Sequence, residues 1–191
     1  MANASERKRQ FAIVALLVVL QATAALVYLW VEHDRETDVD ASFRYERVDA
    51  GLRIPDALLV RADGSSVASD SFRGRPTLLH IWATSCPPCR DELPSLLRYA
   101  AEHPSVRVVA LSTDAEWSPV DRFFAGSIPR EVMRDPGGDV VRALRVQTLP
   151  DTYLLDSGGA ARLRFVGTRE WSSDHARAVL DRFLLQLGGP R

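Results

Sequence analysis

The feature that most constrains the fold is a pair of cysteines placed directly after an apolar run. Residues 77–83 read TLLHIWA, which is typical of a central strand buried on both faces. Both of the chain's cysteines follow, as Cys86 and Cys89, with Pro87 and Pro88 between them. Proline suits the first turn of a helix, where no N–H donor is required. The segment therefore predicts a strand that leads into a helix opened by Cys86.

Three kinds of chemistry use two cysteines at this spacing. A tetrahedral zinc site needs four ligands, and the four histidines lack the spacing that would complete one. A structural disulfide across so short a loop removes little entropy from the unfolded chain. A redox pair fits best, because a helix N-terminus favours the thiolate of Cys86. Cys89, one turn further on, is placed to attack a mixed disulfide formed by Cys86. No metal or organic cofactor is needed.

An uncharged run of 21 residues, 11–31, lies near the N-terminus. As a helix it would span about 31 Å, close to the hydrocarbon thickness of a bilayer. Its basic flank precedes it and a largely acidic flank follows, so the positive-inside rule leaves the N-terminus in the cytoplasm. A cleaved signal peptide is the alternative, because residues 22–24 read ATA. The apolar run continues past that site, which favours an uncleaved anchor and an exported, oxidising location for the rest.

The remaining sequence predicts a single α/β domain. A second apolar run at 106–112 follows a helical pattern at 94–103, so the two strands should be parallel with a right-handed crossover. Further elements are expected as a hairpin turn at 62–65, a helix at 118–126 with Ser118 as N-cap and Pro119 in first position, a short strand at 131–135, a short helix at 138–146, a hairpin of 152–156 with 161–167, and a last helix within 172–189 that ends at Gly188. The expected organisation is a cytoplasmic segment 1–10, a transmembrane signal-anchor 11–31, a tether 32–51 and the domain 52–191.

The charge balance excludes one class of partner. The whole chain carries a net charge of -1. A nucleic-acid binder would show a basic patch or stripe, which this composition lacks, so nucleic acid is not an expected partner.

Four segments together carry a family resemblance. LLHIWATSCPPCRDELPSL, VVALSTD, TLPDTYLLDSGG and VGTREW resemble the thioredoxin-like TlpA/ResA/CcmG group, which are membrane-anchored thiol-disulfide oxidoreductases of the bacterial cell envelope. The resemblance covers about residues 52–187. It implies a thioredoxin-like fold, in which helices flank a central mixed sheet, with an extra helix-containing insertion at 113–146.

The resemblance also implies roles for individual residues. Cys86 would be the nucleophile, Cys89 the resolving thiol and Pro94 the kinking proline of the active-site helix. Pro150 would be a cis-proline facing the pair. Taken alone, a proline directly before a strand is a candidate for a cis bond, here Leu149–Pro150, but an ordinary trans proline is the alternative.

Four further positions near the pair have two readings each or depart from the group. Glu92 would tune the cysteine pKa values, as an acid there does in the group's reductants, or it would be a solvated helix carboxylate. His80 stands where relatives carry a buried Asp or Asn. It would take the proton of Cys89 or be a core histidine bonded to the backbone, and the second is slightly favoured. Ser85 replaces a common aromatic residue, whereas Trp82 is retained, as a site-flanking aromatic or as core.

The predicted function is a periplasmic thiol-disulfide oxidoreductase anchored in the inner membrane. Its expected substrates are disulfides of envelope proteins, such as apocytochrome c or a copper-delivery protein. The resemblance implies a membrane electron donor of the DsbD/CcdA kind. One alternative is a peroxiredoxin-like peroxidase. Another is a non-enzymatic copper-delivery module, although such relatives use C-x-x-x-C and a distal histidine.

Overall fold

A computed structural model of the chain describes residues 10, 13–28, 44–48 and 51–187. The chain forms two units, Met1–Ser42 and Phe43–Arg191. In the first unit, residues 13–28 are helical. Of the helices among the described residues, none is both long and apolar enough to cross a membrane. Both ends of the predicted anchor, most of the segment 1–10 and most of the tether lie outside the described residues.

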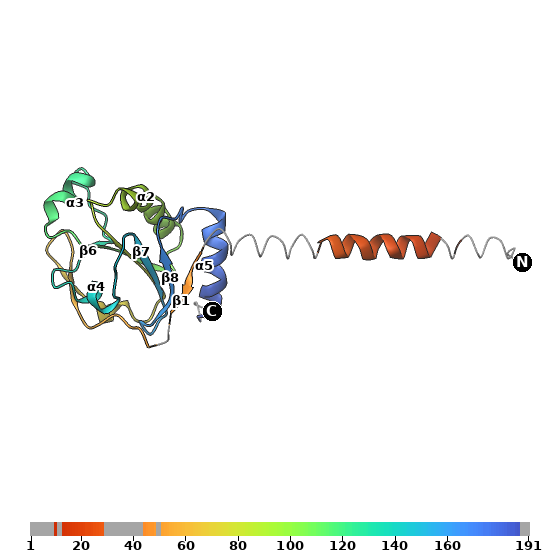
Figure 1. The fold of residues 1–191 in the computed structure, drawn as a ribbon, viewed down its shortest axis with the longest axis horizontal. Coiled ribbons are helices and arrows are strands. Elements are labelled where there is room, and N and C mark those ends of the chain that lie inside the picture. The colour runs from red at the N-terminus through yellow and green to blue at the C-terminus, as the bar shows by residue number, and fades with distance from the viewer. Residues whose placement is uncertain (1–9, 11–12, 29–43, 49–50, 188–191) are drawn as a thin grey trace, which may run out of the picture. The chain divides into compact units, whose positions relative to one another are not determined.

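The second unit is built on a mixed sheet of eight strands in the order β1-β8-β7-β4-β5-β6-β2-β3 (Figure 1). Every residue of the central strand β4 is buried, as its apolar run predicted. This strand is parallel to β5 and antiparallel to β7. The strands are β1 (Glu46–Arg47), β2 (Leu58–Val60), β3 (Ser66–Ala68), β4 (Thr77–Trp82), β5 (Arg107–Ser112), β6 (Val132–Arg134), β7 (Asp151–Leu155) and β8 (Ala161–Val166).

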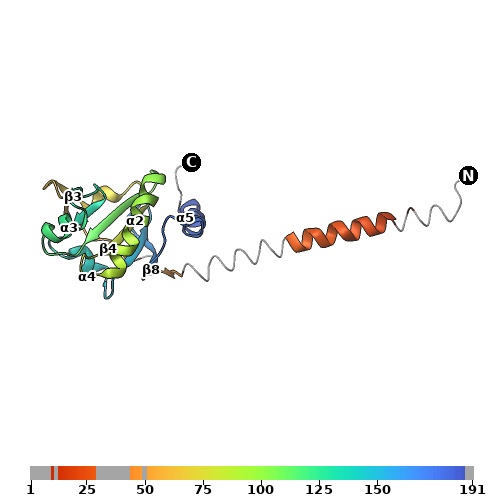
Figure 2. The same cartoon turned by 90° about the horizontal axis from the view of Figure 1, so that it is seen from above.

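Helices cover both faces of this sheet (Figures 1 and 2). The predicted crossover from β4 to β5 is confirmed and is made by α2 (Pro87–Glu102). One face packs against α4 (Asp139–Ala143) and the 3-10 helix η1 (Ser69–Phe72) through a shared apolar core. Helices α2 and α5 (Asp174–Gln186) lie over the other face. The short α3 (Trp117–Phe123) lies near the end of β4 and packs on Trp82.

Most predicted elements are present, including both hairpins, which pair β2 with β3 and β7 with β8. The predicted start of α3 is wrong, because its N-cap is Glu116 and Ser118 already lies inside the helix. The helix begins at Trp117, two residues before the predicted first position, Pro119, and the Arg134 guanidinium stacks 5.4 Å from the Trp117 ring centre. The predicted end of α5 at Gly188 lies outside the described residues.

A short strand also forms inside the range predicted as a tether. Glu46 and Arg47 make β1, which pairs with β8 and forms one edge of the sheet. The neighbouring Tyr45 contacts Phe165 and Phe183 edge-on, with ring centres 6.2 and 5.0 Å away. Two paired residues are too few to produce the alternating pattern from which strands are predicted.

Candidate redox site

The two cysteines lie where β4 gives way to α2. Cys86 is the N-cap of α2, and its Sγ accepts a hydrogen bond from the backbone N–H of Cys89 at 3.3 Å. Pro87 and Pro88 occupy the first turn, as predicted. A disulfide joins the two cysteines, whose Cα atoms are 5.3 Å apart. Cys86 is partly exposed, whereas Cys89 is completely buried. A protein substrate can therefore reach the Cys86 sulfur but not the Cys89 sulfur.

The loop before Cys86 is held by a carboxylate from another strand. Asp114 follows β5, and its two oxygens accept hydrogen bonds from the Thr84 backbone N–H at 2.9 Å and the Thr84 hydroxyl at 2.6 Å. The Ser112 hydroxyl donates a third bond to Asp114 at 2.7 Å. Sequence reasoning missed Asp114 as a site residue. The sequence indicates it only by position, because Asp114 directly follows a buried strand that is parallel to β4. Functional residues often gather at the carboxyl ends of such strands.

The predicted cis-proline lies near the carboxyl end of β4, where the cysteines follow. The Leu149–Pro150 peptide bond is cis. Register pairs Ile81 near the end of β4 with Asp151 at the start of β7, so Pro150 lies beside the end of β4. Pro150 is buried, and Leu149 packs against the apolar core.

A buried polar cluster lies under the start of α2. Glu92 is 1% exposed, and its Oε1 accepts a hydrogen bond from the indole N–H of Trp171. His80 projects from β4, is completely buried, and its Nδ1 lies 2.9 Å from the Thr152 hydroxyl. The same Nδ1 is 3.8 Å from Glu92 Oε1. We call these four residues, His80, Glu92, Thr152 and Trp171, the proton cluster.

The structure contradicts one of the two predicted readings of Glu92 and part of one reading of His80. Glu92 is not a solvated helix carboxylate, because the body of α2 and the Trp171 ring exclude water from it. His80 is a core histidine, but its partner is the Thr152 side chain rather than the backbone. The cross-strand pairing of His80 with Thr152 places both side chains on the same face of the sheet, which explains that choice.

Burial shifts the pKa values of the two titratable groups of the proton cluster so that both are neutral between about pH 3 and pH 7. It raises the pKa of Glu92 to about 7, against the opposing effects of the Trp171 hydrogen bond and of Arg169. It lowers the pKa of His80 to about 3. Below pH 7 the 3.8 Å contact therefore joins a neutral imidazole to a protonated carboxyl and is not an ion pair. Glu92 lies three residues after Cys89, on the same side of α2, so a group able to exchange a proton near pH 7 adjoins the buried cysteine.

Remaining positions differ in their exposure. Trp82 is completely buried and contacts Phe123 and Phe124, with ring centres 5.5 and 6.1 Å away. Ser85 is exposed beside Cys86, so no bulky ring covers the disulfide at this position. Within the described part of the chain, no three His, Cys, Asp or Glu side chains gather closely enough to hold a metal ion.

Known proteins share this fold and this site region. The AhpC/TSA family model matches residues 50–163. The thiol:disulfide interchange protein DsbE of Escherichia coli is 30% identical over 180 residues, which cover 87% of this chain and 92% of that protein. The thiol-disulfide oxidoreductase ResA of Oceanobacillus iheyensis is 29% identical, covering 82% of each chain.

A solved structure gives the same result. The crystal structure of a putative DsbE from Chlorobium tepidum superposes with a TM-score of 0.61 at 28% identity, covering 73% of this chain and 98% of that one. The thioredoxin-like fold, the paired cysteines at the start of α2 and these relatives agree with one another. This chain belongs to the AhpC/TSA family and is a thiol-disulfide oxidoreductase of the TlpA/ResA/CcmG type.

Proposed function

We propose that this oxidoreductase is anchored in the inner membrane, faces the periplasm and reduces disulfides of envelope proteins. Its substrates would be proteins such as apocytochrome c or a copper-delivery protein. The observation that carries the proposal is the arrangement of a partly exposed Cys86 over a buried Cys89 that has Glu92 one turn away. The uncharged run at 11–31 and the similarity to DsbE and ResA support the location and the direction.

The proposed reaction begins from the reduced dithiol. The Cys86 thiolate attacks a substrate disulfide, forming a mixed disulfide and releasing one substrate thiolate, which takes a proton from water. Cys89 then gives its proton to the Glu92 carboxylate and attacks the Cys86 sulfur. The bond between Cys86 and the substrate breaks, and the second substrate thiolate leaves and is protonated. Two electrons have passed to the substrate, and the protein holds the Cys86–Cys89 disulfide seen in this structure.

Each turnover therefore requires two electrons from elsewhere. In an oxidising compartment the dithiol does not re-form without a supply of them. The proposed donor is a membrane electron carrier of the DsbD/CcdA kind, which would attack the accessible Cys86 sulfur in the same way.

The reduction potential of the cysteine pair tests the direction of electron flow. Equilibration with glutathione measures this potential. A reductant should have a reduction potential near that of thioredoxin, about -270 mV, and an oxidant one near that of DsbA, about -120 mV. A value at the oxidising end would overturn the proposed direction while leaving the oxidoreductase activity intact. In the same assay, Cys89→Ser should accumulate a mixed disulfide with substrate and Cys86→Ser should not. If limiting alkylating reagent labels Cys89 first in the reduced protein, the division of roles is wrong.

The location and the two alternative functions need separate tests. A reporter that is active only in the periplasm, fused after residue 191, should be active, and activity only of a cytoplasmic reporter would overturn the orientation. Peroxide consumption without reduction of protein disulfides would favour the peroxidase alternative. Stoichiometric copper binding without disulfide reduction would favour the copper-delivery alternative.

A further inference from the structure

A cavity of about 510 Å³ lies at the end of the sheet opposite the cysteines. Arg75 precedes β4 and Arg107 is the first residue of β5, whereas Cys86 follows the last residue of β4. Six strand residues span about 20 Å, so the cavity is separate from the redox site. Its wall carries four guanidinium groups and one carboxylate, those of Arg61, Arg75, Arg107, Arg130 and Glu131.

Two of these guanidinium groups are held in place but incompletely bonded. Arg75 Nη1 donates to the Pro104 carbonyl at 2.8 Å, and the Arg107 guanidinium stacks 5.4 Å from the ring centre of Phe72. Arg75 Nε and Arg107 Nη1 are both buried, and neither has a hydrogen-bond partner among the described residues. Burial and the nearby charge of Arg75 together lower the pKa of Arg107. The positive charges of Arg75 and Arg107 are therefore held close together, and each guanidinium keeps an N–H donor that could bind a ligand.

The single carboxylate does not neutralise this group. Glu131 pairs with Arg130 at 3.4 Å, and Arg130 is mostly exposed. Arg61 makes one long bond of 3.4 Å to the Arg130 carbonyl. The cavity thus carries an excess of positive charge that an anion would offset.

The inner wall of the same cavity is apolar. Val67, Ala100 and Pro104 line it and are partly or fully exposed, above a buried floor of Phe72, Val106, Val108 and Met133. A bare inorganic ion would leave this apolar surface in contact with water. A ligand with a charged group and an apolar body would cover both parts of the wall.

We propose that this cavity binds an organic phosphate monoester, with the phosphate held by Arg75 and Arg107 and the organic part on the apolar wall. Phosphate suits this site because a guanidinium can bind two of its oxygens at once, and a dianion matches two neighbouring cations. The phosphate group belongs to a soluble metabolite or to a lipid headgroup. None of the cavity residues takes part in the proposed redox reaction, so the two proposals stand or fall separately.

Calorimetric titration of the full chain in a neutral detergent tests the site with phenyl phosphate as the probe. Phenyl phosphate should bind with one-to-one stoichiometry and more tightly than inorganic phosphate, and phenol should not bind. Arg107→Gln and Arg75→Gln should each weaken phenyl phosphate binding about tenfold or more, because each removes a charge-assisted contact. Arg122→Gln, an equal change of charge at an exposed position on α3, should alter the affinity less than twofold.

Backbone amide NMR shifts and a lipid arm complete the test. Phenyl phosphate should move the signals of Phe72, Arg107 and Met133 and leave those around Cys86 in place. If Arg107→Gln unfolds the protein, Arg75→Gln gives the same readout at the second phosphate-binding residue. Nanodiscs that contain phosphatidic acid should compete with phenyl phosphate if the source is a lipid headgroup, and should not if it is a soluble phosphate. Absent binding, or equal weakening by Arg122→Gln, would overturn the proposal.

Discussion

Two buried polar clusters lie on opposite faces of the sheet at neighbouring residues of β7, and they are bonded very differently. Asp151 faces one side, where its carboxylate accepts hydrogen bonds from Arg164 Nη2 at 2.8 Å and from the Tyr153 hydroxyl at 3.0 Å. Thr152 faces the other side and belongs to the proton cluster. There, His80 Nε2 is buried without a hydrogen-bond partner among the described residues, and the Glu92 carboxyl accepts hydrogen bonds from the Trp171 indole and the Arg169 backbone.

The difference separates a structural network from a chemical one. The Asp151 carboxylate is charge-paired with Arg164, and this hydrogen bond raises the pKa of Arg164, so the guanidinium stays charged. The proton cluster is uncharged between about pH 3 and pH 7, and its carboxyl has a pKa of about 7. This desolvated carboxyl destabilises the folded state when it ionises. Its position one helical turn from Cys89 supplies a proton site that a fully paired carboxylate would not.

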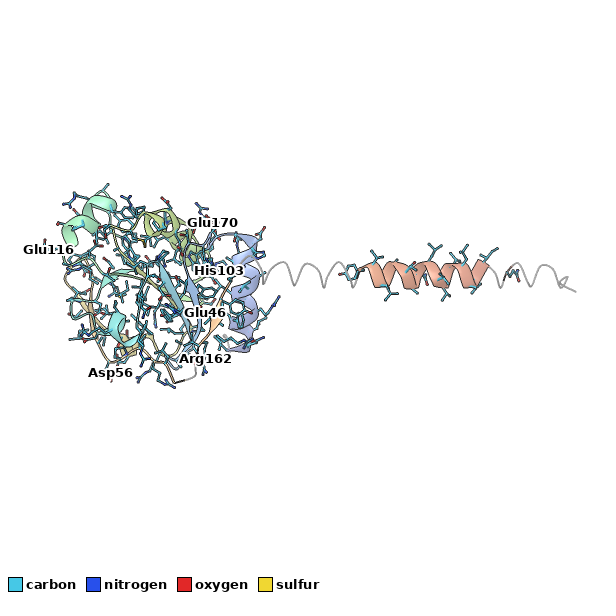
Figure 3. The ribbon with its side chains drawn as sticks, viewed as in Figure 1. Glu46, Asp56, His103, Glu116, Arg162 and Glu170 are labelled. Carbon is cyan, nitrogen blue, oxygen red and sulfur yellow. A yellow bond between two sulfur atoms is a disulfide. The ribbon has the colours of Figure 1, made fainter. Side chains whose placement is uncertain are left out.

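The largest expected effect comes from the paired cluster. Asp151→Asn leaves the partly buried Arg164 guanidinium without its buried charged partner, so the free energy of unfolding should fall by about 3–5 kcal/mol at neutral pH. Glu46, labelled in Figure 3, pairs with the same Arg164 at 3.7 Å but is largely exposed. Glu46→Gln should therefore cost less than about 1 kcal/mol. Denaturant unfolding of the oxidised protein measures both, and similar losses would contradict the assignment of Asp151 as the buried anchor.

Removing the carboxylate of the proton cluster should stabilise the fold, whereas removing that of Asp151 should destabilise it. Burial raises the pKa of Glu92 from 4.5 to about 7, so the folded state loses stability as pH rises through this range. Glu92→Gln retains an acceptor for the Trp171 indole and cannot ionise. Above pH 7 the variant should therefore be more stable than the wild type by up to about 3 kcal/mol. Equal stability of the two proteins at pH 8 would show that Glu92 is not desolvated.

The lowered pKa of His80 should change the stability with pH in the opposite sense to the raised pKa of Glu92. Its pKa falls from 6.5 to about 3 on folding, which removes stability as pH falls through that range. Between pH 4.5 and 6.5 the unfolded chain carries a charged imidazole and a charged carboxylate, and the folded chain carries neither. Folding thus moves one proton from His80 to Glu92 with no net uptake, and the pair adds no slope to the stability curve.

Single variants should break that cancellation. With His80→Asn, only Glu92 titrates, and the unfolding free energy should fall by about 2–3 kcal/mol as pH rises from 4.5 to 6.5, relative to the wild type. With Glu92→Gln the slope should reverse over the same range. The double variant is the control and should match the wild-type slope. If the stability curves of the wild type and of both single variants run parallel over this pH range, folding does not move a proton between His80 and Glu92.

Sequence reasoning predicted the parts of the molecule whose burial repeats along the chain. Strands β4 and β5 are buried on both faces, so their burial appears as continuous apolar runs. The two-residue β1 has no such pattern. The proton cluster was also hidden, because Trp171 lies 79 positions from Glu92 and Thr152 lies 72 from His80. Spacing on one helix suggested that Glu92 adjoins Cys89, but its burial depends on these distant contacts.

The smallest expected effect links the proton cluster to the chemistry of Cys86. In the reduced protein above pH 7, an ionised Glu92 adds a negative charge on the Cys89 side of α2 and disfavours a thiolate nearby. Glu92→Gln removes that charge, so the pH midpoint of Cys86 alkylation should move to lower pH. Cys86 is partly exposed and six residues away, so solvent screens the effect and the shift should stay below about one unit.

Asp91→Asn is the matched control for this shift. Asp91 precedes Glu92 on the same helix but is exposed, and water screens its charge from the cysteines. Its removal should leave the alkylation midpoint within error of the wild type. If Asp91→Asn and Glu92→Gln move the midpoint equally, the effect is one of net helix charge, and burial of Glu92 has no special part in it. If only Glu92→Gln moves it, the buried carboxyl of the proton cluster acts on Cys86.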